Sequence, residues 1–202
     1  MNNNLKKEKQ KFIKGKILEV SKEIVSQNGF EELSIRKIAK KVGYSPGNIY
    51  QYFDNKEEII LEILESGYIN IIKSLNIQSK NKKTIKQTII FKFENYVDEI
   101  LKNPNIYKYI MLSSNPKILE YTNIFNEKNI EKNNKSGIEL LEKQLKKAVN
   151  NKEIKEINCK DMSQLLWSSI FGIIIKHLIE KNYKKKLIIK RINLVIDIFL
   201  ME

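Results

Sequence analysis

The helical spacing of the apolar residues is the feature that most constrains what this chain can fold into. Apolar side chains recur every three or four positions along most of the 202 residues, as they do on one face of an α-helix. Stretches of alternating polarity, which are typical of β-strands, are scarce. Three prolines and seven glycines are also few for a β-protein, which uses these residues in its turns. We therefore predict an all-α fold of about nine helices in total.

Capping and turn residues divide the first part of the chain into four expected helices. The first ends at Asn28-Gly29, the second runs from a Ser34 cap to Gly43, the third begins with Ser45-Pro46, and the fourth covers about residues 55 to 76. The apolar stripe of the first helix consists of Phe12, Ile13, Ile17, Val20, Ile24 and Val25. The order of a helix, a glycine-bearing turn and a short helix is that of a helix-turn-helix motif.

Three residues fit the packing that a helix-turn-helix motif requires. Ala39 is small at the point where the two helices would cross closely, and Gly43 permits a turn conformation that other residues resist. Ile49 can pack the second helix of the motif onto the first. A purely structural helical hairpin would show the same apolar pattern, so the exposed residues must decide between the two.

The exposed side of the third helix favours contact with DNA. It begins with Ser-Pro-Gly-Asn, small residues that let its N-terminus approach a surface closely. The amide side chains of Asn48 and Gln51 suit the N6/N7 edge of adenine. Hydroxyl groups and the backbone amides at the helix start suit phosphate. The predicted DNA-binding residues are Ser34, Arg36, Ser45, Pro46, Gly47, Asn48, Tyr50, Gln51, Tyr52 and Lys56.

The distribution of charge agrees with a polyanionic partner for the N-terminal part. The formal net charge is +13, and residues 1–56 hold twelve Lys and Arg against six Asp and Glu. The net positive charge per residue is therefore more than twice as high in residues 1–56, which carry +6, as in the other 146 residues, which carry +7. A solvated basic face without a partner is the alternative, and only a motif can separate the two readings.

The segment LSIRKIAKKVGYSPGNIYQYFDNKEEII resembles the DNA-binding signature of the TetR family of bacterial transcriptional regulators. The matching residues are Ser34, Ile38, Ala39, Gly43, Ser45, Gly47, Ile49, Tyr50, Tyr52, Phe53, Lys56, Glu57 and Glu58. Tyr44 departs from the pattern, since an aliphatic residue is common there, and Pro46 occupies a variable position. The resemblance implies a three-helix DNA-binding domain with the helix-turn-helix, here residues 9–69, and a helical effector-binding and dimerisation domain, residues 70–202.

The second domain shows the expected run of helices. Apolar stripes predict helices over about residues 85–102 and 106–111, a long helix over 116–150, and two very apolar helices over 159–181 and 186–201. The resemblance implies a small apolar or amphipathic effector in a pocket of this domain. Its aromatic residues are core residues first, and those expected to line the pocket are Phe93, Tyr96, Tyr107, Met111, Phe125, Trp167 and Phe171.

The last two helices carry more apolar surface than their own chain can cover, which suggests a partner subunit. The predicted dimer interface consists of Ile170, Ile174, Ile192, Ile196 and Phe199. A membrane-surface role for residues 183–201 is an alternative, although we expect no membrane partner. In the fourth helix, Gly67 is either a flexible point that transmits an effector signal or a site of close packing.

Scarce residue types exclude several classes of protein. Cys159 and His177 are the only cysteine and histidine, which excludes a disulfide framework, a catalytic triad and a metal site built from these residues. We expect no cofactor, an inert thiol at Cys159, and a surface or dimer-face position for His177. The N-terminus lacks a signal-peptide core, and the apolar stretch 165–179 is shorter than a membrane span. A cytoplasmic location is the simplest expectation.

These observations predict a DNA-binding transcriptional regulator. We expect a homodimeric repressor that binds a palindromic operator in double-stranded DNA and is released by a small-molecule effector. The alternative is a helix-turn-helix protein without an effector, which would differ only in lacking a cavity in the C-terminal domain. An enzyme is not expected, because the chain offers no nucleophile-base pair, metal cluster or phosphate-binding loop.

Overall fold

The computed structural model describes residues 2–78, 84–114, 116 and 137–200, and every regular element in these ranges is helical. The prediction of an all-α fold is confirmed. The helices are α1 (Asn2–Asn28), η1 (Phe30–Glu32, a single 3₁₀ turn), α2 (Ile35–Val42), α3 (Pro46–Ile49), α4 (Lys56–Leu75), α5 (Ile85–Lys102), α6 (Pro104–Leu112), α8 (Gly137–Asn150), α9 (Cys159–Ile179) and α10 (Lys185–Phe199).

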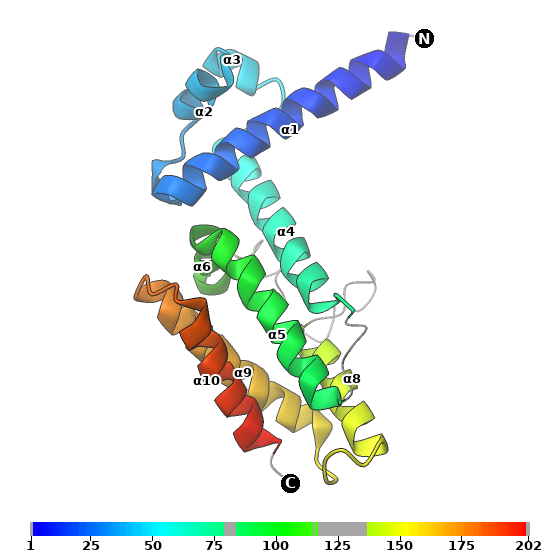
Figure 1. Ribbon diagram of the computed structural model, residues 1–202. Coiled ribbons are helices and arrows are strands. Elements are labelled where there is room, and N and C mark those ends of the chain that lie inside the picture. Colours follow the sequence, from blue (N-terminus) through cyan, green and yellow to red (C-terminus); the bar gives the residue numbers. More distant parts are fainter. Residues whose placement is uncertain (1, 79–83, 115, 117–136, 201–202) are drawn as a thin grey trace.

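Helices α1, α2 and α3 form a small unit at one end of the molecule, above the top of α4 (Figure 1). Its core consists of apolar side chains that are at most 7% exposed: Ile13, Ile17, Ile24, Val25, Phe30, Leu33, Ile38, Ala39, Val42, Ile49 and Phe53. Gly43 ends α2 with a φ of 84°, in the left-handed region that favours glycine. Ala39 and Ile49 are buried at the contact of α2 with α3, as the helix-turn-helix prediction requires.

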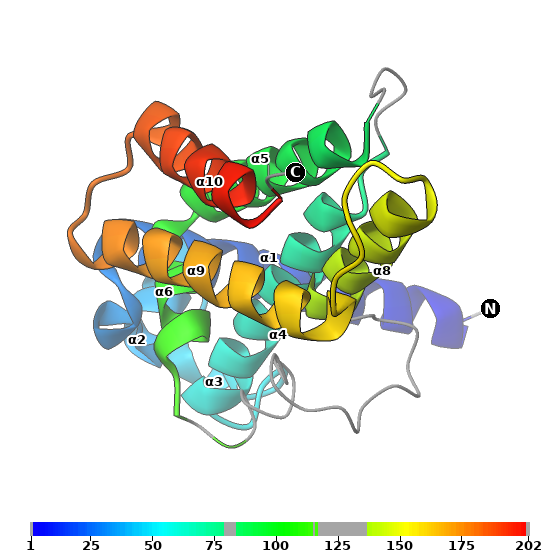
Figure 2. The same ribbon diagram turned by 90° about the horizontal axis from the view of Figure 1, so that it is seen from below.

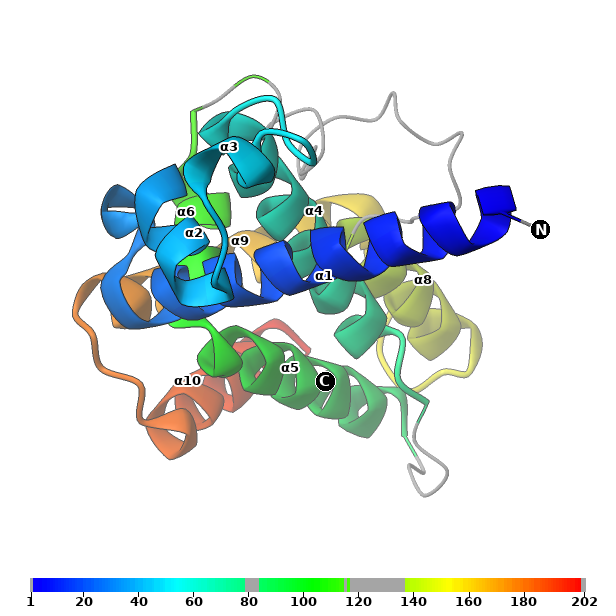
Figure 3. The ribbon, with the colours of Figure 1, turned by 90° about the horizontal axis from the view of Figure 1, so that it is seen from above.

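The first helix differs from the prediction at its N-terminal end. α1 begins at Asn2, so its first turns extend beyond the three-helix unit (Figure 3). Phe12, which was expected on the buried stripe, is 74% exposed although its neighbour Ile13 is 7% exposed, so Phe12 lies on the uncovered face of α1. Lys14 contacts two other segments here: it pairs with Glu62 of α4, and its Nζ lies 4.8 Å from the centre of the Phe53 ring.

Helix α4 connects the N-terminal unit to the rest of the chain. Asn55 caps it, since its Oδ1 accepts a hydrogen bond of 2.8 Å from the backbone N–H of Glu58. From there α4 continues without a break to Leu75 and packs against α1, α5 and α6. The boundary that we expect between residues 69 and 70 therefore falls inside a continuous helix.

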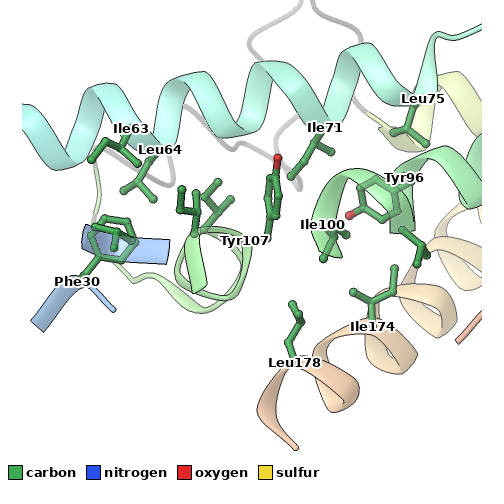
Figure 4. Close-up of a cluster of buried hydrophobic side chains, with 14 of the residues drawn as sticks. Phe30, Ile63, Leu64, Ile71, Leu75, Tyr96, Ile100, Tyr107, Ile174 and Leu178 are labelled. Carbon is green, nitrogen blue, oxygen red and sulfur yellow. The ribbon is translucent and has the colours of Figure 1, made fainter. Parts of the chain in front are cut away.

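Helix α6 forms a second link between the two parts of the molecule. The side-chain amide of Asn105 donates hydrogen bonds to the carbonyl oxygens of Val25 and Ser26, at 3.2 and 3.0 Å, at the C-terminal end of α1. The Tyr109 ring lies 4.2 Å from that of Phe30. Because α6 also packs against α4 and α9, it joins the N-terminal unit to the C-terminal helices (Figure 4).

The C-terminal helices α5, α8, α9 and α10 pack as a bundle beside the lower half of α4 (Figures 1 and 2). α9 contacts α8 on one side and α10 on the other, and α10 also packs on α5. The predicted helices over 85–102, 106–111, 159–181 and 186–201 are confirmed to within a few residues. Of the long helix expected over 116–150, the structure shows α8 from Gly137 onward, and 117–136 lie outside the described residues.

Helix α9 meets the length and composition of a membrane span, which corrects the expectation drawn from residues 165–179 alone. It is 21 residues long, and its apolar character extends nearly all round the helix. In the fold, however, Leu166, Ile170 and Ile174 are buried against the neighbouring helices. A core helix of a helical bundle has the same composition for this reason.

His177 is buried, and the expectation that it lies at the surface or at a dimer face is wrong. Its side chain is 1% exposed and joins α9 to α10. The Arg191 guanidinium lies 2.8 Å from Nε2 and the Asn182 carbonyl oxygen lies 2.9 Å from Nδ1. Because guanidinium can only donate and a carbonyl oxygen can only accept, this geometry requires the neutral tautomer with its proton on Nδ1. The burial of His177 thus depends on a satisfied network.

Candidate nucleic-acid interface

The N-terminus of α3 is exposed to solvent and is capped by a serine side chain. Ser45 is the N-cap, and its Oγ accepts a hydrogen bond of 3.3 Å from the backbone N–H of Asn48. Pro46 follows at the first helical position, where no backbone donor is needed. Ser34 caps α2 in the same way, accepting from the N–H of Lys37 at 3.3 Å. Both hydroxyl groups keep their own proton available to an incoming phosphate oxygen.

The side chains of α3 and of the turn that follows it, residues 50–53, divide into a buried and an exposed set, as reading of DNA bases requires. Ile49 and Phe53 are 0% and 1% exposed and anchor the motif. Asn48 and Gln51 are exposed, and Tyr50 is 54% exposed even though it is aromatic. In Figure 3, which looks down on this end, α2 and α3 lie nearest the viewer beside α1. The amide groups that we predict to contact bases are therefore free to enter a groove.

The basic side chains near α3 differ in whether they form ion pairs within the protein. Lys37 pairs with Glu32, and Lys41 pairs with Glu23 at 2.8 Å, so both neutralise local carboxylates. Arg36 and Lys40 are exposed and make no ion pair within the described residues. Lys56, the first residue of α4, is half-buried. Lys40 was not among the residues predicted from the sequence, and it is exposed on the same helix as Arg36.

The aromatic residues predicted for an effector pocket are partly gathered in one place. Phe93 and Tyr96 of α5 lie 5.9 and 5.6 Å from the ring of Trp167 on α9, measured between ring centres. Tyr107 lies in α6, where its hydroxyl donates a hydrogen bond of 2.7 Å to Glu99. Met111 and Phe171 are half-buried, and Phe125 lies outside the described residues. Phe93, Tyr96 and Trp167 thus form an aromatic cluster that joins α5 to α9.

A small void lies beside this aromatic cluster. Its volume is about 10 Å³, roughly enough for a single water molecule. Phe93 and Trp167 belong to its wall, together with residues that the sequence reasoning missed: Leu75, Lys92, Gly137 and Gln144. A larger molecule could bind at this void only if the described side chains or helices around it moved.

Burial perturbs several titratable groups of the C-terminal bundle. Desolvation raises the pKa of Tyr96 and Tyr107, the latter helped by the hydrogen bond to Glu99. Desolvation, together with the nearby Lys147, lowers the pKa of Lys92. Burial also raises the pKa of the Cys159 thiol, which opposes the activation that a helix N-terminus could supply.

Four of the five residues predicted for the dimer interface are unavailable to a partner. Ile170, Ile174, Ile192 and Ile196 are at most 2% exposed, because α9 and α10 pack these faces on each other and on the bundle. Only Phe199 is half-buried. The apolar surface that does face outward from the same two helices consists of Leu165, Ile179, Leu194 and Ile198, each at least 54% exposed.

Comparison with known proteins agrees with this geometry. The model of the bacterial regulatory proteins of the tetR family matches residues 17–63, the segment from α1 to the first part of α4. The chain is 25% identical over 123 residues to the fatty acid metabolism regulator protein of Bacillus subtilis, covering 61% of this chain and 62% of that protein. The match thus spans less than two thirds of that relative.

Two solved structures share the fold over nearly their whole length. One is the regulator FadR from Bacillus subtilis in complex with stearoyl-CoA, with a TM-score of 0.68 and 21% identity over 92% of this chain and 97% of that one. The other is the fatty acid degradation regulator FadR from Bacillus halodurans, with a TM-score of 0.69 and 14% identity over 91% and 93%. The capped helix-turn-helix and its family match identify residues 17–63 as a DNA-binding unit of the tetR family of bacterial regulatory proteins, and the chain as a whole shares the fold of such regulators.

Proposed function

We propose that this protein is a homodimeric repressor that binds a palindromic operator and releases it when an acyl effector binds in the C-terminal bundle. The exposed surface of α3, with Asn48, Tyr50 and Gln51 around a capped helix N-terminus, is the observation that supports operator binding most directly. Ser34, Arg36, Ser45, Gly47, Tyr52 and Lys56 would supply the surrounding phosphate contacts. A cytoplasmic location follows from this role.

The dimer is proposed to form through the outward faces of α9 and α10. These helices lie side by side along one edge of the molecule (Figure 1). Leu165, Leu194 and Ile198 are each 57–59% exposed there, and water-exposed apolar groups of this size gain by being covered. Gly172 lies on the exposed side of α9, and an added Cβ would meet no atom within 4 Å, so a partner helix could approach closely. Phe199 would extend this surface.

The effector class is inferred from the relatives and from the chemistry of the bundle. The similar regulator whose structure holds stearoyl-CoA has its fold in common with this chain. In this chain, the core of the C-terminal bundle offers an aromatic cluster of Phe93, Tyr96 and Trp167, which suits an apolar chain. A long-chain acyl group on a polar carrier is therefore the proposed ligand, and Met111 and Phe171 are candidates for lining its path.

A second candidate function is DNA binding without an effector. The observation that favours it is the size of the void, which at about 10 Å³ has no room for an acyl chain. The two functions separate in one titration, because only the first predicts that an acyl compound weakens binding to the operator. The relatives matched here are regulators of transcription, which speaks against an enzyme.

Operator binding is tested with DNA selected by the protein from a random-sequence pool. Asn48→Ala and Gln51→Ala should each weaken operator binding by about 1–3 kcal/mol while leaving random DNA unaffected. Lys56→Ala should weaken both DNAs equally and reduce the slope of log affinity against log salt by about one unit. Fluorescence anisotropy over a series of salt concentrations measures all of these quantities.

The matched control is Asn70→Ala, which removes an exposed amide from α4, well below α3. It should bind both DNAs like the unaltered protein. If Asn48→Ala and Gln51→Ala lower the affinities for operator and random DNA by the same factor, these side chains contact no base, and the proposed base contacts are wrong.

A further inference from the structure

The indole N–H of Trp167 has no hydrogen-bond partner although it is buried. The side chain is 6% exposed, and Nε1 is one of two buried side-chain polar atoms without a partner in the described part of the chain. A buried donor that loses its bond to water and gains nothing in exchange costs about 1–3 kcal/mol. A phenylalanine would fill an apolar core without this cost. The unpaired indole N–H therefore suggests that a bound molecule supplies the acceptor, since the free protein does not.

The same void is bordered by a lysine that caps another helix. Lys92 of α5 lines the void, and its Nζ donates a hydrogen bond to the carbonyl oxygen of Leu75, the last residue of α4. Burial and the neighbouring Lys147 both disfavour the positive charge of Lys92 and lower its pKa. No carboxylate forms an ion pair with Lys92 among the described residues. An anionic group or a strong hydrogen-bond acceptor placed beside Lys92 would stabilise its positive charge.

Trp167 and Lys92 thus place two donors beside one apolar cavity. We propose that the polar end of an acyl compound binds here, its carbonyl or carboxylate oxygens accepting from Trp167 Nε1–H and from the Lys92 ammonium. The acyl chain would extend among α5, α8 and α9, along the aromatic side chains of Phe93 and Tyr96. This inference rests on the proposed effector-controlled repressor and adds to it the residues that select the effector.

The position of Lys92 also supplies a route from the effector to the DNA-binding end. Its bond to Leu75 holds the C-terminal end of α4, and the N-terminal end of α4, capped by Asn55, follows α3 in the chain after the turn of residues 50–55. An effector oxygen that takes Lys92 away from Leu75 leaves the Leu75 carbonyl without its side-chain donor, while Asn76 still donates to the carbonyl of Ile72. The effector then favours whatever tilt of α4 the free carbonyl allows, and the ratio of affinities for the two states limits the change in operator binding.

Binding is measured by isothermal titration calorimetry with three ligands that have the same chain length. Dodecanoate carries a free carboxylate, dodecanoyl-CoA carries a thioester, and dodecyltrimethylammonium has no acceptor. Trp167→Phe should weaken binding of both acyl compounds about 5- to 10-fold, the value of one hydrogen bond. Lys92→Met should weaken dodecanoate at least 10-fold, as for a hydrogen bond to a charged group, and Lys92→Arg should restore it.

The controls separate this site from general changes in the protein. Lys143→Met removes an exposed lysine from α8 and should change no affinity. Binding of dodecyltrimethylammonium should not be weakened by Trp167→Phe. Because Trp167 is the only tryptophan, its fluorescence in the unaltered protein should respond to both acyl compounds. Stronger binding of dodecanoate or of dodecanoyl-CoA identifies the free acid or the thioester as the natural form.

Two results would overturn the inference, and they differ in what else they overturn. If acyl compounds bind and release the operator equally well in Trp167→Phe, Lys92→Met and the unaltered protein, effector control stands and this site is wrong. If no acyl compound binds the unaltered protein although the operator does, both this site and the acyl-controlled repressor are wrong, and DNA binding without such an effector remains.

Discussion

At the scale of single residues, Glu99 shows how one carboxylate joins two helices. It lies on α5, where its oxygens accept hydrogen bonds of 2.7 Å from the Tyr107 hydroxyl of α6 and from Lys102. Burial opposes ionisation of this carboxyl, but the two hydrogen bonds outweigh it, so the pKa of Glu99 lies below its usual value of 4.5. The α5–α6 corner is therefore stabilised by a charge that acid removes.

Glu99→Gln should reveal this contribution as a pH dependence of stability. A carboxyl whose pKa is depressed by folding contributes its full stabilisation above its unfolded pKa and loses it as the pH falls through its folded pKa. The unaltered protein should thus unfold at higher urea concentration than Glu99→Gln at pH 7, and the difference should shrink steadily below about pH 4.5. Tyr107→Phe should retain part of the pH dependence, since Lys102 remains. A difference that stays constant between pH 7 and pH 3 would contradict this account.

At the scale of helices, the sequence predicted the elements better than their partners. Capping residues such as Ser34 and Ser45 act within a few residues of themselves, so the helix starts that they predict are confirmed. The exposure of Phe12 and the burial of His177 depend on which distant helix lies opposite, which no local pattern contains. The prediction of the dimer-interface residues was wrong for the same reason. Ile192 and Ile196 are apolar because α9 and α5 cover them, and the helical period cannot distinguish that cover from a second subunit.

Residues of the candidate sites could be predicted from the sequence where their neighbours are close in the chain, and not where their partners lie on other helices. Asn48 and Gln51 lie within a single short motif, so the spacing alone placed them on its exposed side. The contribution of Lys92 depends on Leu75 and Trp167, which lie on two other helices. Asn105 likewise gains its role from the end of α1, 79 and 80 residues away. Such residues have no distinguishing pattern in the sequence and become visible only in the fold.

Gly67 allows a prediction about the contact of α4 with α6. A Cβ at this position would lie 3.1 Å from methyl carbons of both Ile106 and Ile110, which favours close packing as the reason for this glycine. Gly67→Val should therefore lower the free energy of unfolding by about 1–3 kcal/mol through overpacking. Gly67→Ala should have little net effect, since about 1 kcal/mol of helix propensity offsets a smaller clash.

Gly15 in α1 provides the matched control, because an added Cβ there meets no atom within 4 Å. Gly15→Val should not destabilise the protein, and urea unfolding of the three variants and the unaltered protein makes the comparison. If Gly67→Val is as stable as Gly15→Val, the close-packing account is wrong. A loss of effector response in Gly67→Ala without any change in stability would instead support a flexible point in α4.

At the scale of the whole molecule, the proposed dimer face predicts a folded monomer. Leu194→Glu combined with Ile198→Glu adds two charges to the outward face of α10, where both side chains are more than half exposed. Helical content should persist because neither residue belongs to the core of the protomer. Light scattering at micromolar concentration should show half the mass of the unaltered protein. Operator affinity should also fall, because a palindrome is read by two recognition helices about 34–36 Å apart.

Two control variants test the logic of this prediction. Ile196→Glu places a charge at a side chain that is 0% exposed, so it should unfold the protein instead of separating subunits. Lys190→Glu reverses an exposed charge on the same helix and should leave the dimer intact. A dimer that survives Leu194→Glu with Ile198→Glu would show that the subunits meet elsewhere.

The small size of the void beside Trp167 has a consequence for the timing of the proposed response. A void of about 10 Å³ has no room for an acyl chain, so binding of the proposed effector requires the helices around Trp167 to move apart first. When binding requires such an opening, the observed rate rises with effector concentration at low dose and then levels off at the opening rate. In a stopped-flow experiment, the fluorescence of Trp167 should show this plateau. At saturating effector concentration, the delay before transcription changes would be set by the rate at which these helices open.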